Sequence, residues 1–277
     1  MIRVAVVFGA IGCALLVSAN CATAADPVEL KVISFNVLVD FSPQPGVPKW
    51  ADRKDLCIQV LREQNADLLG LQEPSPGQVK FFLAQLPDYE PVHYKTYTDA
   101  TLLYKRELFE ELERGTWFLS PTPERVSTGF GNALPRVVVW AKLKHKPSGR
   151  ELLVFNTHFD NSMPSQVKMA ELCQKKFATF AEQKLPMIFM GDFNTNQKRG
   201  DYARLVSEGW RDSYCASSKA SPDGRDDNVP THLNQTRIDH IFYHGAIKAL
   251  SWERLESPDP QKLLSDHYAI AARLALE

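Results

Sequence analysis

The length, composition and charge of the chain are those of a soluble, folded protein. Its 277 residues suffice for one large α/β domain or two small ones, and its 44% of hydrophobic residues can bury a substantial core. The formal net charge of −1 shows no basic excess of the kind that tight non-specific DNA binding normally requires. Nucleic acid therefore remains a possible substrate only if a local basic patch binds it.

The first 25 residues have the three-part layout of a secretory signal peptide. A basic start at Arg3 precedes a largely apolar, uncharged run over 4–17, and small residues follow up to Ala24 and Ala25. The run is short for a membrane-spanning helix, which needs about 20 apolar residues. We therefore predict cleavage of residues 1–25, export to the periplasm or out of the cell, and no membrane span in the mature chain. An uncleaved anchor and a lipid-modified cysteine are the alternatives.

The first half of the remaining chain alternates strand and helix patterns. Short apolar or alternating runs indicate strands, and apolar residues at helical spacing, such as Leu56, Val60 and Leu61, indicate helices. Strands are expected over 30–35, 67–72, 101–104 and 110–118, and helices over 53–64 and 79–86.

The second half continues this pattern to the C-terminus. A loop over 120–135 leads to strands at 137–143 and 151–156, a helix at 166–183, and strands at 185–190, 237–243 and 268–274. The polar, turn-rich stretch over 217–235 is expected to be a long loop. Because strand patterns recur up to the end, we predict one α/β domain over 26–277.

Three cysteines remain in the predicted mature chain: Cys57, Cys173 and Cys215. Their number and spacing match no metal-binding pattern and allow at most one disulfide within the chain. Because free cysteine is among the most buried residue types, we interpret Cys57 and Cys173 as apolar positions on buried helix faces.

Polar residues with chemical capacity stand where the predicted apolar strands begin or end. Strands bring such residues to a shared edge of a sheet, where open α/β sheets hold their sites. Any one of these residues alone is an ordinary turn former or capping residue, but together they would be costly to desolvate without a purpose. The residues are Asn36, Glu73, Asn156, His158, Asp160, Asp192, Asn194, Asp239, His240, Asp266 and His267.

In this order the residues resemble the motifs of the endonuclease/exonuclease/phosphatase superfamily, which includes DNase I-like nucleases, inositol-polyphosphate phosphatases and bacterial sphingomyelinases. The resemblance implies an α/β fold of four layers, in which two mixed β-sheets pack face to face with helices outside and the site lies at one end. The chain looks closest to a bacterial branch that also carries Trp50-Ala51-Asp52-Arg53-Lys54 and Ala133-Leu134-Pro135-Arg136. The six motifs are Ser34-Phe35-Asn36, Leu71-Gln72-Glu73, Asn156-Thr157-His158-Phe159-Asp160, Gly191-Asp192-Phe193-Asn194, Arg237-Ile238-Asp239-His240 and Ser265-Asp266-His267.

The resemblance further implies hydrolysis of a phosphate ester by an activated water, assisted by a divalent metal ion. Magnesium prefers oxygen ligands and often uses one or two carboxylates plus waters, so we expect Mg²⁺, with Mn²⁺ as a substitute. Glu73 is the expected ligand, with Asn36 beside it and Asp266 as a further carboxylate. The metal would stabilise the charge that develops on the phosphoryl group and the leaving oxygen.

The other motif residues are expected to act on the water and the phosphate. Asp192 looks like the residue that orients or deprotonates the water, and Asn194 can donate to a phosphate oxygen. His267 would bind the phosphate while Asp239 keeps its ring protonated. His158 would bind phosphate or protonate the leaving group. Whether Asp192 or His267 is the general base stays open in the sequence.

Three further residues are candidates for contact with the substrate. Arg136 precedes a strand and could clamp a phosphate with two hydrogen bonds, or be an ordinary surface arginine. His232 lies in the polar loop, and functional residues favour loops. Asp160 closes the motif of His158.

The substrate itself stays open among four alternatives. A small phosphorylated metabolite or sugar phosphate is favoured because no basic excess is visible, followed by a secreted nuclease, a sphingomyelinase-like phosphodiesterase and a phosphoinositide phosphatase. A catalytically silent binding module on the same scaffold is disfavoured, because degenerate members normally lose a metal carboxylate or the last Asp-His pair. We expect a monomeric hydrolase acting on phosphoric ester bonds.

Overall fold

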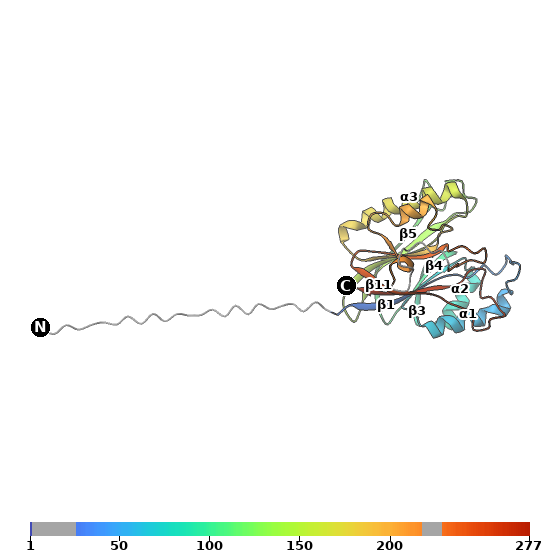
Figure 1. The fold of residues 1–277 in the computed structure, drawn as a ribbon, viewed down its shortest axis with the longest axis horizontal. Coiled ribbons are helices and arrows are strands. Elements are labelled where there is room, and N and C mark those ends of the chain that lie inside the picture. Colours follow the sequence, from blue (N-terminus) through green and yellow to red (C-terminus); the bar gives the residue numbers. More distant parts are fainter. Residues whose placement is uncertain (2–25, 218–228) are drawn as a thin grey trace.

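The computed structural model describes residue 1 and residues 26–217 and 229–277. The predicted signal peptide lies outside the described residues apart from Met1, and so does the middle of the predicted loop over 217–235. The boundary between residues 25 and 26 therefore stays a prediction. In the described part, two β-sheets are stacked on one another with helices on the outside (Figure 1).

Two mixed six-stranded sheets form the centre of the molecule. Their strands are β1 (Val28–Asn36), β2 (Leu68–Gln72), β3 (Tyr89–Tyr94), β4 (Tyr97–Lys105), β5 (Phe109–Phe118), β6 (Val137–His145), β7 (Glu151–His158), β8 (Met187–Asp192), β9 (Arg211–Asp212), β10 (Asp239–His244), β11 (Ile247–Arg254) and β12 (Ile270–Leu276). The first sheet has the order β11-β12-β1-β2-β4-β3 and the second the order β5-β6-β7-β8-β10-β9. At the centre of each, two strands run parallel: β1 with β2, and β7 with β8.

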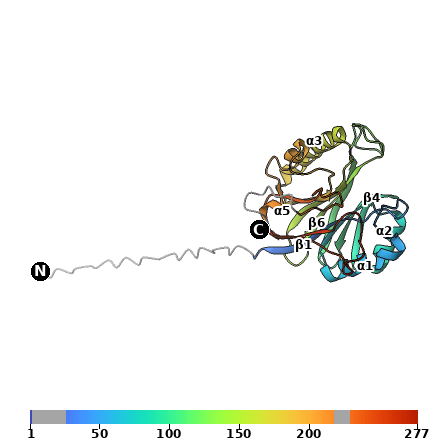
Figure 2. The same ribbon diagram turned by 45° about the vertical axis from the view of Figure 1, so that its right-hand side comes forward.

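Helices cover the outer faces of both sheets, α1 and α2 on the first and α3 on the second (Figure 2). None of the helices in the described ranges is both long and apolar enough to cross a membrane. The helices are α1 (Trp50–Gln64), α2 (Pro76–Gln85), α3 (Met163–Phe180), a 3₁₀ turn η1 (Ala181–Gln183), α4 (Gly200–Leu205) and α5 (Ser213–Ala216).

Alternation along the central strands creates the layers. Successive side chains of a strand point to opposite faces, so Val32 enters the core between the sheets while Ile33 packs toward α1. In the same way Val154 faces the first sheet and Phe155 faces α3. The four-layer α/β sandwich expected from the sequence is confirmed.

The differences from the expected elements lie at the edges of the sheets, at the starts of helices and in the short helices α4 and α5, which were not expected. Strands β3 and β11 end the first sheet, and neither was expected. β3 contains Pro91, which an edge strand tolerates because no second neighbour needs its missing N–H. Helix α2 begins three residues early at Pro76, where Ser75 and Gln78 form a capping box. Cys57 and Cys173 are buried on α1 and α3, as expected.

A buried amide joins the two sheets beside the strand ends. Asn156 of β7 donates its Nδ2 to the carbonyls of Leu71 at 2.9 Å and Thr101 at 3.0 Å, both in the first sheet. Its Oδ1 accepts from Gln72 Nε2 at 2.7 Å. Gly70 permits this close approach, because a Cβ there would lie 2.6 Å from Asn156 Oδ1. The contact fixes the ends of β2 and β7 relative to one another.

Candidate active site

Side chains from both sheets meet at one end of the sandwich. In the first sheet Asn36 ends β1 and Glu73 follows β2, the two parallel central strands. In the second sheet His158 ends β7 and Asp192 ends β8, and these two residues are partners in the parallel register. Asp239 begins β10 and is the antiparallel partner of Asp192. Parallel strands thus deliver their C-terminal residues to one edge, as the sequence predicted.

Asn36 connects the carboxylates of the two sheets. Its Nδ2 donates to Glu73 Oε1 and to Asp192 Oδ2, both at 3.0 Å. Its Oδ1 accepts the backbone N–H of Leu38 at 3.1 Å and keeps a second lone pair. The amide therefore presents its hydrogens to the carboxylates, and its role as a metal ligand stays a prediction.

His267 lies between two aspartates. Its Nδ1 is 2.9 Å from Asp239 Oδ2 and its Nε2 is 3.6 Å from Asp192 Oδ2. Burial lowers the pKa of His267, but Asp239 and Asp192 outweigh this effect and raise the pKa to about 10. The imidazole therefore carries a proton at neutral pH and presents a hydrogen-bond donor to the site.

The second imidazole, His158, has a partner that the sequence analysis missed. Its Nδ1 lies 3.2 Å from Asp99 Oδ1, and its Nε2 lies 3.4 Å from Asp192 Oδ2. Burial and Arg136 lower the pKa of His158, yet Asp99 and Asp192 shift it above its ordinary value. The available signal for Asp99 was a lone carboxylate just before the expected strand over 101–104.

Arg136 is buried, with 9% of its surface exposed, so the alternative of an ordinary surface arginine is wrong. Its Nη1 lies 3.1 Å from Asp99 Oδ2 and 2.7 Å from His158 Nδ1. Its Nε lies 3.9 Å from Asp160 Oδ2, while Asp160 Oδ1 accepts the N–H of Ser162. Arg136 thus holds the residues around His158 together, and the structure places it beside the site.

Two site residues adopt the left-handed backbone conformation, which is uncommon for residues other than glycine. Glu73 has φ 60° and Asn194 has φ 50°. Asparagine tolerates this region, whereas glutamate does so less readily, and such strain concentrates at functional sites. The side chain of Asn194 donates to the carbonyl of Phe159 at 3.0 Å, so it ties two site loops together. Its contact with a phosphate stays a prediction.

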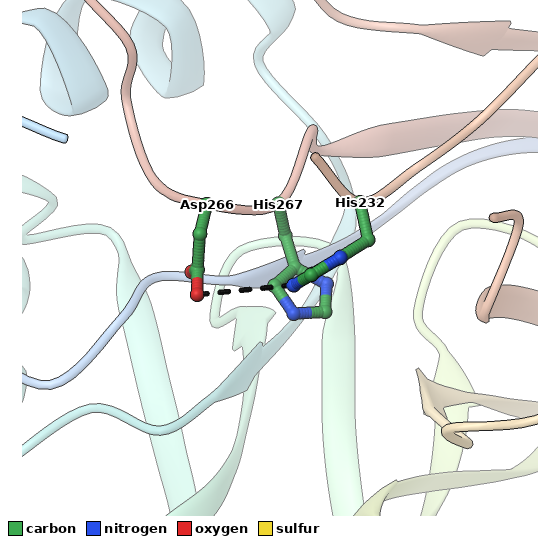
Figure 3. Close-up of side chains that lie close together, drawn as sticks. All are labelled: His232, Asp266 and His267. Atoms are coloured by element: carbon green, nitrogen blue, oxygen red, sulfur yellow. Dashed lines mark ion pairs between the residues drawn. The ribbon is translucent and has the colours of Figure 1, made fainter. Parts of the chain in front are cut away.

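His232, Asp266 and His267 come together from two loops at the edge of the site (Figure 3). The Nε2 of His232 lies 3.9 Å from Asp266 Oδ2, and its ring packs edge-on against His267 with centroids 4.6 Å apart. Its Nδ1 accepts the backbone N–H of Asn234 at 3.0 Å. An uncharged His232 therefore carries its proton on Nε2, on the side that faces Asp266.

The donor atoms of the site fit a divalent cation. Three groups of histidine and carboxylate side chains occur among the described residues, and the ligand atoms within each group lie within 4.8 Å of one another. His267 belongs to two of them, but its protonated ring has no lone pair to offer. The other ligand atoms belong to His158, His232 and four carboxylates, and carboxylate oxygens are the ligands that Mg²⁺ prefers. In addition, Asp239 Oδ1 is buried without a hydrogen-bond partner in the described part of the chain.

The stacked mixed sheets, with carboxylates, amides and imidazoles at one end, define the DNase I-like class of folds. A model of the Endonuclease/Exonuclease/phosphatase family matches residues 33–267, and the chain belongs to this family. The resemblance drawn from the six motifs is thereby confirmed. Enzymes of this family hydrolyse phosphoester bonds and typically depend on a divalent metal ion.

Similar proteins match this chain in sequence, and the solved structures match it also in fold, over most of their length. A family member from Bacteroides thetaiotaomicron is 27% identical, with a TM-score of 0.79 over 91% of this chain and 99% of its own. A mannosyl-6-phosphatase from the VPI-5482 strain of that species is also 27% identical, with a TM-score of 0.78 over 88% of this chain and 99% of its own. A protein of Acanthamoeba polyphaga mimivirus is 26% identical over 235 residues, which are 77% of this chain and 87% of that protein.

Proposed function

We propose that the protein is an exported phosphoesterase that uses water to cleave a P–O bond of a small phosphorylated metabolite, with Mg²⁺ or Mn²⁺ as cofactor. One observation carries this proposal: Asp192 Oδ2 lies 3.4 Å from His158 Nε2, 3.6 Å from His267 Nε2 and 3.0 Å from Asn36 Nδ2. The hydrogen-bond donors suit the oxygens of a phosphoryl group, and the carboxylate suits a water that must lose a proton.

Asp192 is the general base in this proposal. It accepts a proton from the water that attacks phosphorus, while His267 donates a hydrogen bond to a phosphoryl oxygen. His267 is poorly suited to the role of base, because its pKa of about 10 leaves the ring already protonated. Asp239 holds the Nδ1 proton of His267 and so keeps Nε2 directed at the site.

His158 is the proposed general acid. Asp99 and Asp192 raise the pKa of His158 and so favour its protonated form, and Nε2 faces the site while Nδ1 is held by Asp99. A proton delivered to the leaving oxygen completes the departure of the alcohol. Arg136 and Asp99 thus position the imidazole through its Nδ1 atom.

Glu73, Asn36 and Asp266 are the residues proposed to hold the metal ion. When bound, the ion supplies positive charge to the phosphoryl and leaving oxygens, which an anionic ester needs in order to react with water. The contact of Asn36 Nδ2 with Glu73 Oε1 keeps this carboxylate turned toward Asp192.

A small phosphorylated metabolite, and a sugar phosphate in particular, is the favoured substrate. The near-neutral chain lacks the basic excess of a nucleic-acid-binding surface. The similarity to a mannosyl-6-phosphatase supports the same class. Export rests on the charge and apolar pattern of residues 1–25.

The test is hydrolysis of a panel of esters by the full chain, with and without Mg²⁺. The panel contains hexose phosphates, bis(p-nitrophenyl) phosphate, plasmid DNA and sphingomyelin, and cell fractionation in the same expression experiment measures export. We expect metal-dependent release of phosphate from a small ester, lost in Asp192→Asn and kept in Asp55→Asn, which changes an exposed carboxylate on α1. A folded, metal-loaded protein that hydrolyses no member of the panel would contradict the proposed function.

A further inference from the structure

A cavity of about 440 Å³ opens directly beside the proposed reaction centre. Its lining includes Glu73 and His158, whose Oε1 and Nε2 lie 3.7 Å apart, and the same Nε2 lies 3.4 Å from Asp192. The lining also includes Phe41, Tyr97 and Leu134. A phosphate held at His158 would therefore have the rest of its ester in a space that large apolar side chains help to line.

Two of the apolar side chains that line the cavity have little protein to cover them. Phe41 follows β1 and is 78% exposed, and Leu134 precedes β6 and is 61% exposed. They are 93 positions apart in the chain and yet line the same cavity. Large apolar side chains that gather at the mouth of a polar site mark a place that a ligand covers.

The third of these lining residues, Tyr97, gives the cavity a fixed surface. The hydroxyl of Tyr97 donates to the carbonyl of Pro135, and its ring packs against Phe118 with centroids 6.1 Å apart. The ring therefore needs no reordering to receive a ligand, which favours contact with a flat or ring-shaped group.

The charges of the cavity argue against a second phosphate. Among the described residues that line it, Arg136 is the only lysine or arginine, and it is already engaged by Asp99 and placed against His158. The described lining therefore offers a second phosphate no lysine or arginine beyond Arg136, which disfavours a polyanion such as a nucleic acid strand in this cavity.

We infer that the cavity receives the alcohol part of the substrate, and that this alcohol is an uncharged ring with at least one apolar face. The inference rests on the proposed function, because the ester is placed by its phosphoryl group at His158 and Asp192. An aryl group and the less polar face of a pyranose share this chemistry. Phe41 and Leu134 are then the residues that determine specificity.

Binding of two phosphonates tests this inference without any turnover. At a pH above the second pKa of both acids, phenylphosphonate and methylphosphonate are dianions that differ in having a phenyl ring or a methyl group, so titration calorimetry of the full chain in Mg²⁺ isolates the contribution of the ring. We expect phenylphosphonate to bind about tenfold more tightly, and Phe41→Ala and Leu134→Ala to remove most of this difference. Leu112→Ala, which truncates an exposed leucine on β5 outside the cavity, should leave it unchanged.

Turnover measurements then distinguish an aryl alcohol from a sugar as the source of the ring. The value of kcat/KM for phenyl phosphate, glucose 6-phosphate and glycerol phosphate is measured for the wild type and for Phe41→Ala. A loss confined to phenyl phosphate identifies an aryl alcohol, and a loss that extends to glucose 6-phosphate identifies a sugar, while glycerol phosphate is unaffected in both cases.

Two results would overturn the inference. One is equal affinity of the wild type for the two phosphonates, and the other is an equal loss of affinity for both phosphonates in Phe41→Ala. Tighter binding of an oligonucleotide than of phenylphosphonate would also contradict it. If the affinity ratio holds while no ester is hydrolysed, the cavity stands as a ring-binding site and the proposed function fails.

Discussion

Asp192 and Asp239 are direct partners across the antiparallel strands β8 and β10, and the ring of His267 contacts both carboxylates. Two buried carboxylates in neighbouring positions repel one another, and the proton on His267 relieves this repulsion. The same proton gives the site a donor for phosphate. One histidine therefore balances the charge of the site and takes part in its proposed chemistry.

The Asp239→Asn change should move the alkaline limit of activity. Without this carboxylate, the pKa of His267 falls from about 10 toward its ordinary value of about 6.5. Because the folded pKa is raised, the protonated ring stabilises the fold fully below about pH 6.5, and this stabilisation is lost as the pH rises through about 10. We expect the alkaline limb of kcat/KM to lie at lower pH in the variant than in the wild type, beginning at about pH 7. NMR titration of the His267 ring checks the cause, and an unchanged ring titration would remove Asp239 from this role.

The Glu73→Gln change should weaken binding of the metal ion. The variant keeps the size of the side chain and loses the charge, so the Mg²⁺ concentration for half-maximal activity should rise by roughly 10–100-fold. Chelation should abolish wild-type activity, and added Mg²⁺ should restore it. Glu107→Gln, an exposed site between β4 and β5, is the matched control. Equal Mg²⁺ dependence of Glu73→Gln and the wild type would take Glu73 out of the metal site.

The Asp99→Asn change should lower the pKa of His158. Asp99 is a main cause of the raised pKa of this ring, so its loss leaves less protonated His158 at neutral pH. If His158 donates the proton to the leaving oxygen, kcat should fall on the order of 10²-fold and its alkaline limb should move to lower pH. Asp99→Glu should restore part of the activity. A variant with reduced stability and an unshifted pH profile would give Asp99 a purely structural role.

The Gly70→Ala change should loosen the contact between the sheets. A Cβ at this position would lie 2.6 Å from Asn156 Oδ1 and 2.7 Å from Met190 Sδ, so these side chains must move. We expect a loss of about 1–3 kcal/mol in the free energy of unfolding, measured by urea denaturation. Gly77→Ala on α2 is the control, because a Cβ there meets nothing closer than 3.7 Å. Equal stabilities of the two variants would show that the sheets tolerate the added atom.

The sequence predicts the central strands well because both of their faces are buried. β1, β2, β7 and β8 are covered by the other sheet on one side and by helices on the other, which leaves an apolar pattern along the chain. Edge strands have no such requirement. β3 includes Pro91 and β11 exposes part of its length, so their strand conformation depends on a neighbouring strand that the local sequence does not reveal.

The candidate site is predictable where a residue belongs to a strand end, and less so where its role depends on contacts between sheets. Asn36, Glu73, His158 and Asp192 stand at such ends and converge as expected. Asp99 acts on His158 from β4 of the other sheet, across 59 positions of the chain. No local pattern encodes that proximity, because the packing of one sheet on the other creates it.

The position of Asn156 between the two sheets predicts how activity is lost when the protein is partly destabilised. The proposed metal ligands Asn36 and Glu73 belong to one sheet, and Asp192 to the other, so sliding of the sheets separates the two halves of the chemistry. Each sheet can keep its own strand pairing during such a movement. Mild denaturing conditions should therefore abolish the proposed activity while circular dichroism still records intact secondary structure. Loss of activity would then report that the two sheets have moved relative to one another.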